Sequence, residues 1–193
     1  MLTHLRPALL LLALLSLLTG AIYPLSVTVL SQAMAPAQSQ GSLIRVNGTV
    51  VGSALLGQAF TAPGYLHPRP SAGDYATLPS AASNLAPTNA AMLKAVAARV
   101  AAWQAETGTT PPIDAVTTSG SGLDPDVSPD TALAQADRIA RARGVSADAV
   151  AQIIAAHRKG PWLGLFGQAR VNVLETNLAL DAALPPGPAA PKP

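Results

Sequence analysis

Residues 117–144 read TTSGSGLDPDVSPDTALAQADRIARARG, which predicts the end of a strand, a glycine-rich turn and then a helix. Ser128 is a good N-cap, Pro129 suits the first helical position, and Gly144 is a natural stop. The helix is expected to bury the apolar residues that recur at helical spacing, Leu133, Ala136, Ile139 and Ala140. Its last turns carry three basic residues, Arg138, Arg141 and Arg143.

A glycine-rich turn before a helix often binds phosphate, because its amides point at the anion. Here Asp124, Asp126 and Asp130 surround the helix start and would repel a phosphate, and no Gly-Lys-Ser/Thr ending follows. A calcium loop counted from Asp124 would place Gln135 where a bidentate Glu is needed. The stretch is therefore interpreted as a packed turn whose Asp and Ser side chains cap backbone amides, and no metal site is predicted.

The composition narrows the class of protein. The 193 residues allow one modest domain plus an anchor. The formal charge is +2 and charged residues make up 11%, so nucleic acid is not a predicted partner. Cysteine is absent, which excludes disulfides and thiolate chemistry. No G-x-S-x-G elbow occurs, and the three histidines stand far apart in the sequence, so no catalytic residues are predicted.

Residues 7–30 contain no charged side chain and are long enough to form a transmembrane helix. Arg6 precedes this run and the next basic residue is Arg45, so the positive-inside rule predicts that residues 1–6 are cytoplasmic and that the rest of the chain is extracytoplasmic. Ser16 and Gly20 are four apart and are candidates for close packing against another membrane helix. Pro24 is expected to bend the helix or to mark its outer end.

A cleaved secretory signal is the alternative for this N-terminus. Ala33-Met34-Ala35 fits a small-x-small cleavage pattern, and release there would give a secreted solute-binding protein or hydrolase. The apolar run is longer than the roughly 7–15 residues of a signal core, which favours a retained anchor. A membrane-tethered solute-binding module is a further alternative.

Turn and capping residues divide the rest of the chain. Asn47-Gly48 predicts a hairpin within residues 43–51. Leu93, Val96, Val100 and Trp103 form one stripe of a helix over residues 89–106, with Trp103 in the core. The other predicted segments are a linker at 31–42, an irregular loop at 61–87, a strand at 113–117, a helix from Ser146 to a cap at His157, a short closing helix at 178–184 and a disordered proline-rich tail at 185–193. Together they predict an α/β (α+β) domain over residues 43–184.

Several separate runs resemble the KdpC family, the C subunit of the Kdp potassium-transporting P-type ATPase complex. The longest is the turn Ser119, Gly120, Ser121, Gly122, Leu123, Asp124 and Pro125, followed by the run that ends at Gly144. The others are residues 52–60, Tyr65 with Arg69-Pro70-Ser71, residues 83–89 beginning Ser83-Asn84, and residues 170–177. Ala86 replaces the family's glycine, which would strain a turn if positive φ were needed there.

The resemblance implies a non-catalytic accessory subunit in the bacterial cell inner (cytoplasmic) membrane. Its partners would be a potassium-channel-like subunit, a P-type ATPase subunit and a small single-span subunit. The chain itself would hold no cofactor, and ATP would bind the ATPase subunit. Tyr65, Arg69, Pro70, Ser71, Ser83 and Asn84 become candidates for partner contact, although Arg69 pinning its own loop is an equal alternative.

The family is also described as a catalytic chaperone that raises the ATPase subunit's affinity for ATP, and the resemblance links Gln135 to the nucleotide. The topology above places Gln135 outside, across roughly 30 Å of hydrocarbon from cytoplasmic ATP. An indirect effect is therefore the favoured interpretation, because it needs only that this subunit bind two states of the pump unequally.

Overall fold

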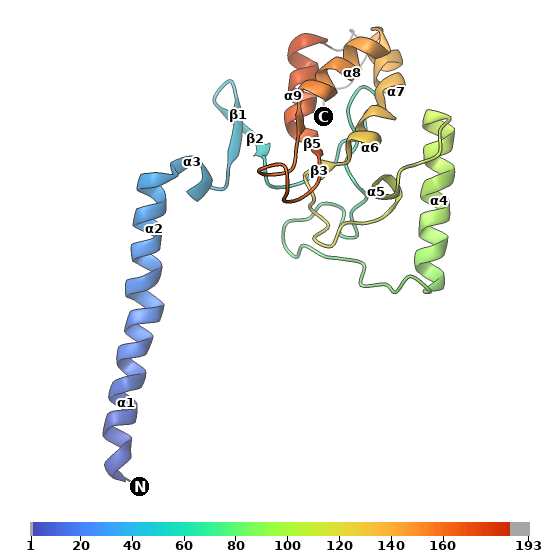
Figure 1. Cartoon of the computed structure of the whole chain (residues 1–193). Helices are drawn as coiled ribbons and strands as arrows, with labels where there is room; N and C mark the ends of the chain where they lie inside the picture. Colours follow the sequence, from blue (N-terminus) through green and yellow to red (C-terminus); the bar gives the residue numbers. More distant parts are fainter. Residues whose placement is uncertain (1, 186–193) are drawn as a thin grey trace. The chain divides into compact units, whose positions relative to one another are not determined.

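The computed structural model describes residues 2–185 and contains both helices and strands (Figure 1). The chain divides into two compact units, Met1–Val51 and Gly52–Pro193. The tail predicted to be disordered lies, beyond Pro185, outside the described residues. The mixed fold class and the single N-terminal apolar helix agree with the sequence prediction.

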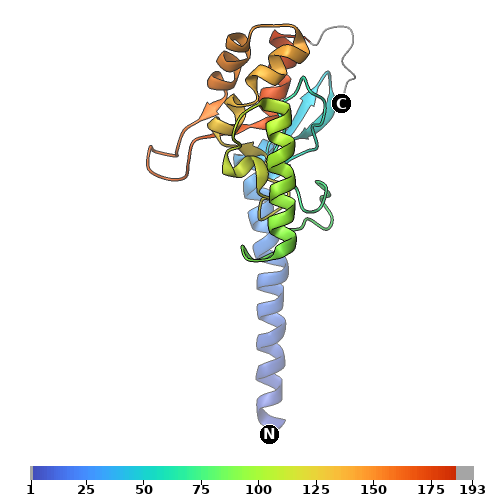
Figure 2. The same ribbon diagram turned by 90° about the vertical axis from the view of Figure 1, so that its right-hand side faces the viewer.

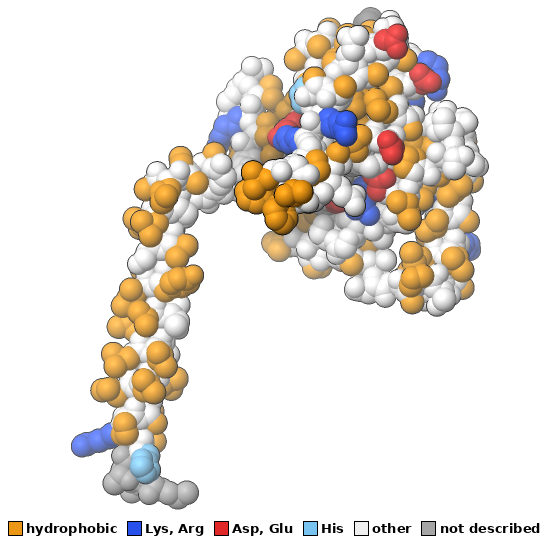
Figure 3. Space-filling model, in the orientation of Figure 1, with side chains coloured by type: hydrophobic (Ala, Val, Ile, Leu, Met, Phe, Trp, Pro, Cys, Tyr) orange, Lys and Arg blue, Asp and Glu red, His pale blue; other side chains and the backbone are white. Residues whose placement is uncertain are grey.

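The first unit is dominated by one long helical run. It comprises α1 (Leu2–Leu17), the π-helical turn η1 (Leu18–Ile22) and α2 (Tyr23–Met34). Residues His4–Met34 have a mean hydropathy of 2.2 and are long and apolar enough to cross a membrane. Hydrophobic side chains are exposed along the length of this run on the face that Figure 3 shows.

Pro24 does not end this helix, so that part of the prediction is wrong. A proline lacks an N–H, and in a regular α-helix its ring would crowd the carbonyl four residues earlier, here that of Gly20. The π-helical turn accommodates it, since the Tyr23 N–H bonds back to the Leu18 carbonyl. The helix then continues to Met34.

The predicted linker is more helical than expected, because α2 takes its first residues and α3 (Pro36–Ser39) forms another turn. The predicted hairpin is confirmed as β1 (Leu43–Val46) paired with β2 (Thr49–Ser53). Asn47 and Gly48 have φ of 51° and 81°, the positive values that a two-residue hairpin turn requires.

The second unit is built on a small antiparallel sheet with the order β3-β5-β4. The strands are β3 (Asp126–Val127), β4 (Arg158–Lys159) and β5 (Arg170–Asn172). Val171 at the centre of β5 is opposite Val127 on one side and Arg158 on the other. The loop between β4 and β5 projects from the rest of the unit (Figure 2).

Four helices enclose the core of this unit. They are α6 (Pro129–Leu133), α7 (Ala136–Arg143), α8 (Ala147–Ala156) and α9 (Val173–Ala183). The core cluster includes Leu66, Ile139, Val150, Ile154, Val171 and Leu180. The predicted caps of α8 are confirmed, since Ser146 accepts a hydrogen bond from the Ala149 amide and the His157 ring lies 2.9 Å from the Ile153 carbonyl oxygen.

The single helix predicted after Ser128 is instead two helices. Ser128 caps α6 by accepting a hydrogen bond from the Thr131 amide, and Gly144 ends α7 in the left-handed conformation, as predicted. The helix is interrupted between them by a turn at Ala134 and Gln135. Leu133 was expected on the buried face, but it precedes the break and is 45% exposed, whereas Ala136, Ile139 and Ala140 are buried.

One further segment, and the burial of another, differ from the prediction. Residues 113–117 form no strand; α5 (Ile113–Val116) is a helical turn in which the Thr117 hydroxyl donates a hydrogen bond to the Ile113 carbonyl.

The helix predicted over 89–106 is confirmed as α4 (Ala90–Thr107), capped by Asn89 and ended by Gly108. Its stripe is only half-buried, and Leu93 is exposed. Trp103 is likewise half-buried rather than a core residue, because α4 packs mainly on the short α5 and on α7.

Candidate functional site

Side chains of the turn at residues 119–125 accept hydrogen bonds from the backbone amides in and next to the turn. The Ser119 hydroxyl accepts a hydrogen bond from the Gly122 amide at 2.9 Å, and the Ser121 hydroxyl accepts one from Leu123 at 3.0 Å. The Asp124 carboxylate accepts from the Asp126 amide at 3.1 Å. These amides are therefore already bonded, which is the arrangement expected of a packed turn rather than of a phosphate loop.

Gly122 is the glycine on which this turn depends. Its φ is +70°, and a Cβ atom there would collide with the Ala81 carbonyl oxygen and lie 3.3 Å from the Ser71 hydroxyl. We expect Gly122→Ala to lower the free energy of unfolding by at least about 2 kcal/mol, from the left-handed backbone and the collision together. The measurement is urea unfolding of the full chain in detergent micelles. Gly120→Ala is the control, because no atom of the described residues lies within 4 Å of its added Cβ; equal losses in the two variants would contradict this account.

The long loop over residues 61–87 is pinned against this turn. Arg69 Nη1 lies 2.9 Å from Asp124 Oδ2, and the Tyr75 hydroxyl donates to the Arg69 carbonyl at 2.7 Å. The Ser71 hydroxyl accepts from the Gly73 and Tyr75 amides. In this structure Arg69 thus holds its own loop, one of the two roles considered for it.

The segment after Pro70 and Ser71 also contacts Thr118, the residue before the turn at 119–125. The Ser83 hydroxyl lies 3.5 Å from that of Thr118. Asn84 adopts a φ of 51°, which asparagine tolerates better than most residues. Ala86, which stands where the family has glycine, is not among the residues with positive φ. The backbone strain considered for this position therefore does not occur.

A separate polar cluster binds residues 63–67, which we call the clamped segment. Gln135 Oε1 accepts a hydrogen bond from the His67 amide at 2.8 Å, and its Nε2 donates to the His67 carbonyl at 3.2 Å. Asn177 does the same at the preceding residue, accepting from the Leu66 amide at 2.7 Å and donating to the Leu66 carbonyl at 3.0 Å. Two side-chain amides thus replace the neighbouring strand that would normally pair with such a backbone.

Two arginines bind the remaining carbonyls of the clamped segment. Arg138 donates to Pro63 at 2.6 Å and to Tyr65 at 3.1 Å, and Arg143 donates to Gly64 at 2.6 Å. All five carbonyls of the segment therefore accept a side-chain hydrogen bond. We call Gln135, Arg138, Arg143 and Asn177 the clamp residues; each is at most 7% exposed.

The clamp is tied to the end of α9 through Asp181. Its carboxylate accepts from Arg143 Nη2 at 2.8 Å and from the Tyr65 hydroxyl at 3.1 Å. The Arg143 guanidinium also lies 5.0 Å from the centre of the Tyr65 ring, a cation–π contact, and donates to the Leu184 carbonyl. Tyr65, a candidate for partner contact, is only 3% exposed and belongs to the interior.

Burial sets the ionisation of the groups around the clamp. It lowers the pKa of Arg138 to about 10, partly opposed by Glu106, whose carboxylate lies 3.8 Å from Arg138 Nε. Burial, and then the positive charge of Arg138, lowers the pKa of His67. Burial followed by Asp181 raises the pKa of Tyr65. At neutral pH Arg138 therefore stays charged beside a neutral His67.

Gln135 has no hydrogen-bonding capacity left for a ligand. Its Oε1 accepts from the His67 amide and from Arg138 Nη2 at 2.6 Å. Its Nε2 donates to the carbonyls of His67 and Thr131. A primary amide has two acceptor and two donor positions, and all four are filled. Direct contact with a nucleotide would require the clamp to open.

An open depression of about 590 Å³ lies beside the motif turn, lined by Arg69, Arg170, Asp114, Asp124, Asp126 and Asp130. Burial raises the pKa of Asp126, which accepts from Asn172 and pairs with Arg170 at 3.0 Å. Burial would also raise the pKa of Asp114, but hydrogen bonds from Ser128 and Thr131 outweigh it and lower that pKa. Within residues 2–185 no three His, Asp or Glu side chains gather as a metal site.

The sequence analysis singled out Gln135 but missed the other three clamp residues. A signal for two of them was present. Arg143 follows the buried Ile139 by four positions, and Asn177 follows Val173 by four, so each shares the inward face of its helix. Ser16 and Gly20, the candidate membrane-packing residues, lie in α1 and η1, and neither is buried by the chain itself.

These observations define a class: a mixed α/β domain on one long apolar helix, with a buried polar cluster that holds its own backbone. Residues 5–182 match the family described as KdpC, K+-transporting ATPase, c chain. A potassium-transporting ATPase KdpC subunit of Cereibacter sphaeroides is 61% identical over 95% of this chain and 99% of the relative. Proteins of the same description from Sorangium cellulosum and Caulobacter vibrioides are 54% and 52% identical, over 95% and 96% of this chain and 100% and 96% of the relatives. The chain belongs to the KdpC family.

Proposed function

We propose that this chain is the accessory C subunit of an ATP-driven potassium-uptake complex. The observation that carries the proposal is the match over residues 5–182, which includes both the apolar helix and the folded domain. ATP hydrolysis and ion selection belong to partner subunits: a P-type ATPase and a potassium-channel-like protein, with a small single-span subunit beside them. This chain stabilises the assembly and holds no cofactor of its own.

The proposed location is the bacterial inner membrane, with one span. Residues 1–6, which include Arg6, lie in the cytoplasm, residues 7–30 cross the bilayer, and the domain over 43–184 is extracytoplasmic. In support, the helix His4–Met34 is long enough to span a bilayer. Its apolar side chains are not covered by the rest of the chain, so they are free to contact lipid. Ser16 and Gly20 then provide a flat face for a partner's helix.

Copurification tests the assembly. A tagged chain is purified from detergent-solubilised membranes of the native organism grown in low potassium, and the bound proteins are identified by mass spectrometry. We expect a P-type ATPase and a potassium-channel-like protein in fixed proportion. Recovery of the chain alone in a soluble fraction, trimmed after Ala35, would contradict the proposal and favour the secreted alternative.

The proposed effect on ATP is indirect and acts through the clamp. Every polar atom of the Gln135 amide is bonded inside the domain, which leaves none for a nucleotide. Its influence would come from the shape of the clamped segment and the surface above it. A subunit that binds two pump states unequally alters the pump's apparent ATP affinity without contacting ATP.

Asn177 supplies the control that separates the direct and indirect accounts. It holds the segment from α9 as Gln135 holds it from the start of α7. We expect Gln135→Ala and Asn177→Ala, each in an assembled complex, to weaken ATP affinity by similar factors, as measured from the ATP dependence of hydrolysis. A tenfold loss in Gln135→Ala alone, with intact assembly and unchanged affinity in Asn177→Ala, would support direct contact instead.

A further inference from the structure

The loop between β4 and β5 is a small preformed hairpin with an apolar tip. The Trp162 amide donates to the Phe166 carbonyl at 2.8 Å, and the Phe166 amide donates back to Trp162 at 3.0 Å. Their rings are 5.7 Å apart between centroids. Leu163 and Gly164, at the tip, have φ of 53° and 74°. The loop is therefore held in one shape by its own bonds.

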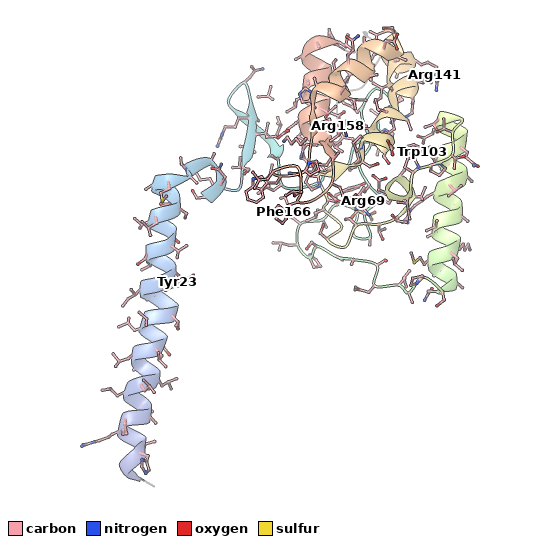
Figure 4. All side chains as sticks on the ribbon, in the orientation of Figure 1. Tyr23, Arg69, Trp103, Arg141, Arg158 and Phe166 are labelled. Carbon is pink, nitrogen blue, oxygen red and sulfur yellow. The ribbon has the colours of Figure 1, made fainter. Side chains whose placement is uncertain are left out.

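The four large apolar side chains of this loop, which we call the apolar tip, point into solvent. Trp162, Leu163, Leu165 and Phe166 are 68%, 70%, 81% and 60% exposed. Figure 3 shows hydrophobic side chains gathered on one face of the unit, and Figure 4 places Phe166 there. A contiguous apolar patch of this kind on a folded domain marks a surface that binds something apolar.

Basic residues stand on the two strands that carry the apolar tip. Arg158 and Lys159 form β4, and Arg170 begins β5 opposite Lys159. Residues 160–169 between them contain no charged side chain. Lys159 and Arg170 are each about half exposed although they pair with Glu175 and Asp126. Exposed tryptophan, phenylalanine and leucine side chains flanked by basic residues favour the interface of a bilayer, where the rings lie at the level of the headgroups.

The unit that carries this loop is also tethered to the apolar helix. The apolar helix ends at Met34, and residues 35–51 connect it with the second unit. Even fully extended, that connection reaches only about 60 Å. Tethering makes contact between the loop and lipid an intramolecular event with a high effective concentration of lipid. Even a loop with weak intrinsic affinity for lipid would therefore be bound for much of the time.

We propose that the apolar tip inserts into the interfacial region of the lipid bilayer, with Arg158 beside the headgroup phosphates. The contact would be a second membrane attachment, separate from the spanning helix. It would limit the orientations available to the domain. This inference requires only that His4–Met34 spans the membrane and does not depend on the role proposed in ATP-driven transport.

Tryptophan fluorescence tests the proposal, because the chain has two tryptophans. Trp103→Phe leaves Trp162 as the reporter, and Trp162→Phe leaves Trp103, which lies on α4 away from Phe166 (Figure 4). Each full-length variant is placed in nanodiscs of phosphatidylcholine and phosphatidylglycerol, with or without brominated acyl chains. We expect bromination to reduce Trp162 emission about twofold and to leave Trp103 emission unchanged, since interfacial tryptophan lies within contact of the acyl chains.

Trp162 emission that bromination does not alter in the full chain would overturn the proposal. If that emission instead shifts to the blue when the complex's other subunits are present, the apolar tip binds a protein partner. Circular dichroism matched to the parent chain ensures that both variants are folded when they are compared.

Discussion

Replacing Gln135 with alanine is expected to lower the free energy of unfolding by about 3–5 kcal/mol. The substitution leaves the partly buried amide and carbonyl of His67 without partners and removes one acceptor from Arg138. Each polar group left unpaired away from water costs about 1–3 kcal/mol, and the alanine side chain has no donor or acceptor that could replace the lost hydrogen bonds. Urea unfolding of the full chain in micelles, followed by circular dichroism, measures the loss.

Gln152→Ala is the matched control for this variant. Gln152 is an exposed glutamine inside α8, so its replacement should change the free energy of unfolding by less than about 0.5 kcal/mol. Asn177→Ala should resemble Gln135→Ala, because it frees the amide and carbonyl of Leu66 in the same way. A Gln135→Ala chain as stable as Gln152→Ala would mean that the clamp does not hold the domain together.

Replacing Arg143 with methionine is expected to cost a similar amount, about 3–5 kcal/mol. The change keeps much of the side chain's volume but removes the charge that pairs with Asp181 and the donors to the Gly64 and Leu184 carbonyls. The Arg143 side chain is fully buried, so water cannot take over those bonds. The stacking of the guanidinium over Tyr65 is lost as well.

Arg141→Met, two positions earlier on the same helix, controls for the loss of a positive charge from α7. Among residues 2–185 the Arg141 side chain makes one hydrogen bond, a long and exposed one to the Glu106 carbonyl at 3.4 Å. Its replacement should change the free energy of unfolding by less than about 1 kcal/mol. Equal losses for the two arginines, measured by the same unfolding experiment, would refute a specific role for Arg143.

Local signals in the sequence predicted local structure well. Asn47-Gly48 identified the hairpin, Ser128 and Ser146 identified helix starts, and Gly144 identified a helix end, because each is a short-range steric or capping preference. The strand predicted at 113–117 failed because so few residues cannot distinguish alternation from a helical turn. Asp114 stabilises the helical turn, since its carboxylate accepts hydrogen bonds from the Ser128 amide and the Thr131 hydroxyl.

The clamp could not be predicted from local patterns. Gln135 precedes a helix and reads as an ordinary helical residue, yet it bonds a segment 68 positions earlier in the chain. The break before α7 follows from the same contact, since it turns Gln135 and Arg138 toward the clamped segment. The positions of Arg143 and Asn177 on buried helix faces indicated that they are interior, but not what they bind.

The sequence separation of these bonds has a consequence for how the chain is made. The clamped segment is synthesised soon after the apolar helix, but its bond to Asn177 spans 111 residues, and the bond of Tyr65 to Asp181 spans 116. At the usual rate of protein synthesis, its apolar residues wait on the order of ten seconds before α9 exists to cover them. The domain therefore completes its folding only after α9 has been synthesised, and until then the nascent chain is most exposed to aggregation and proteolysis.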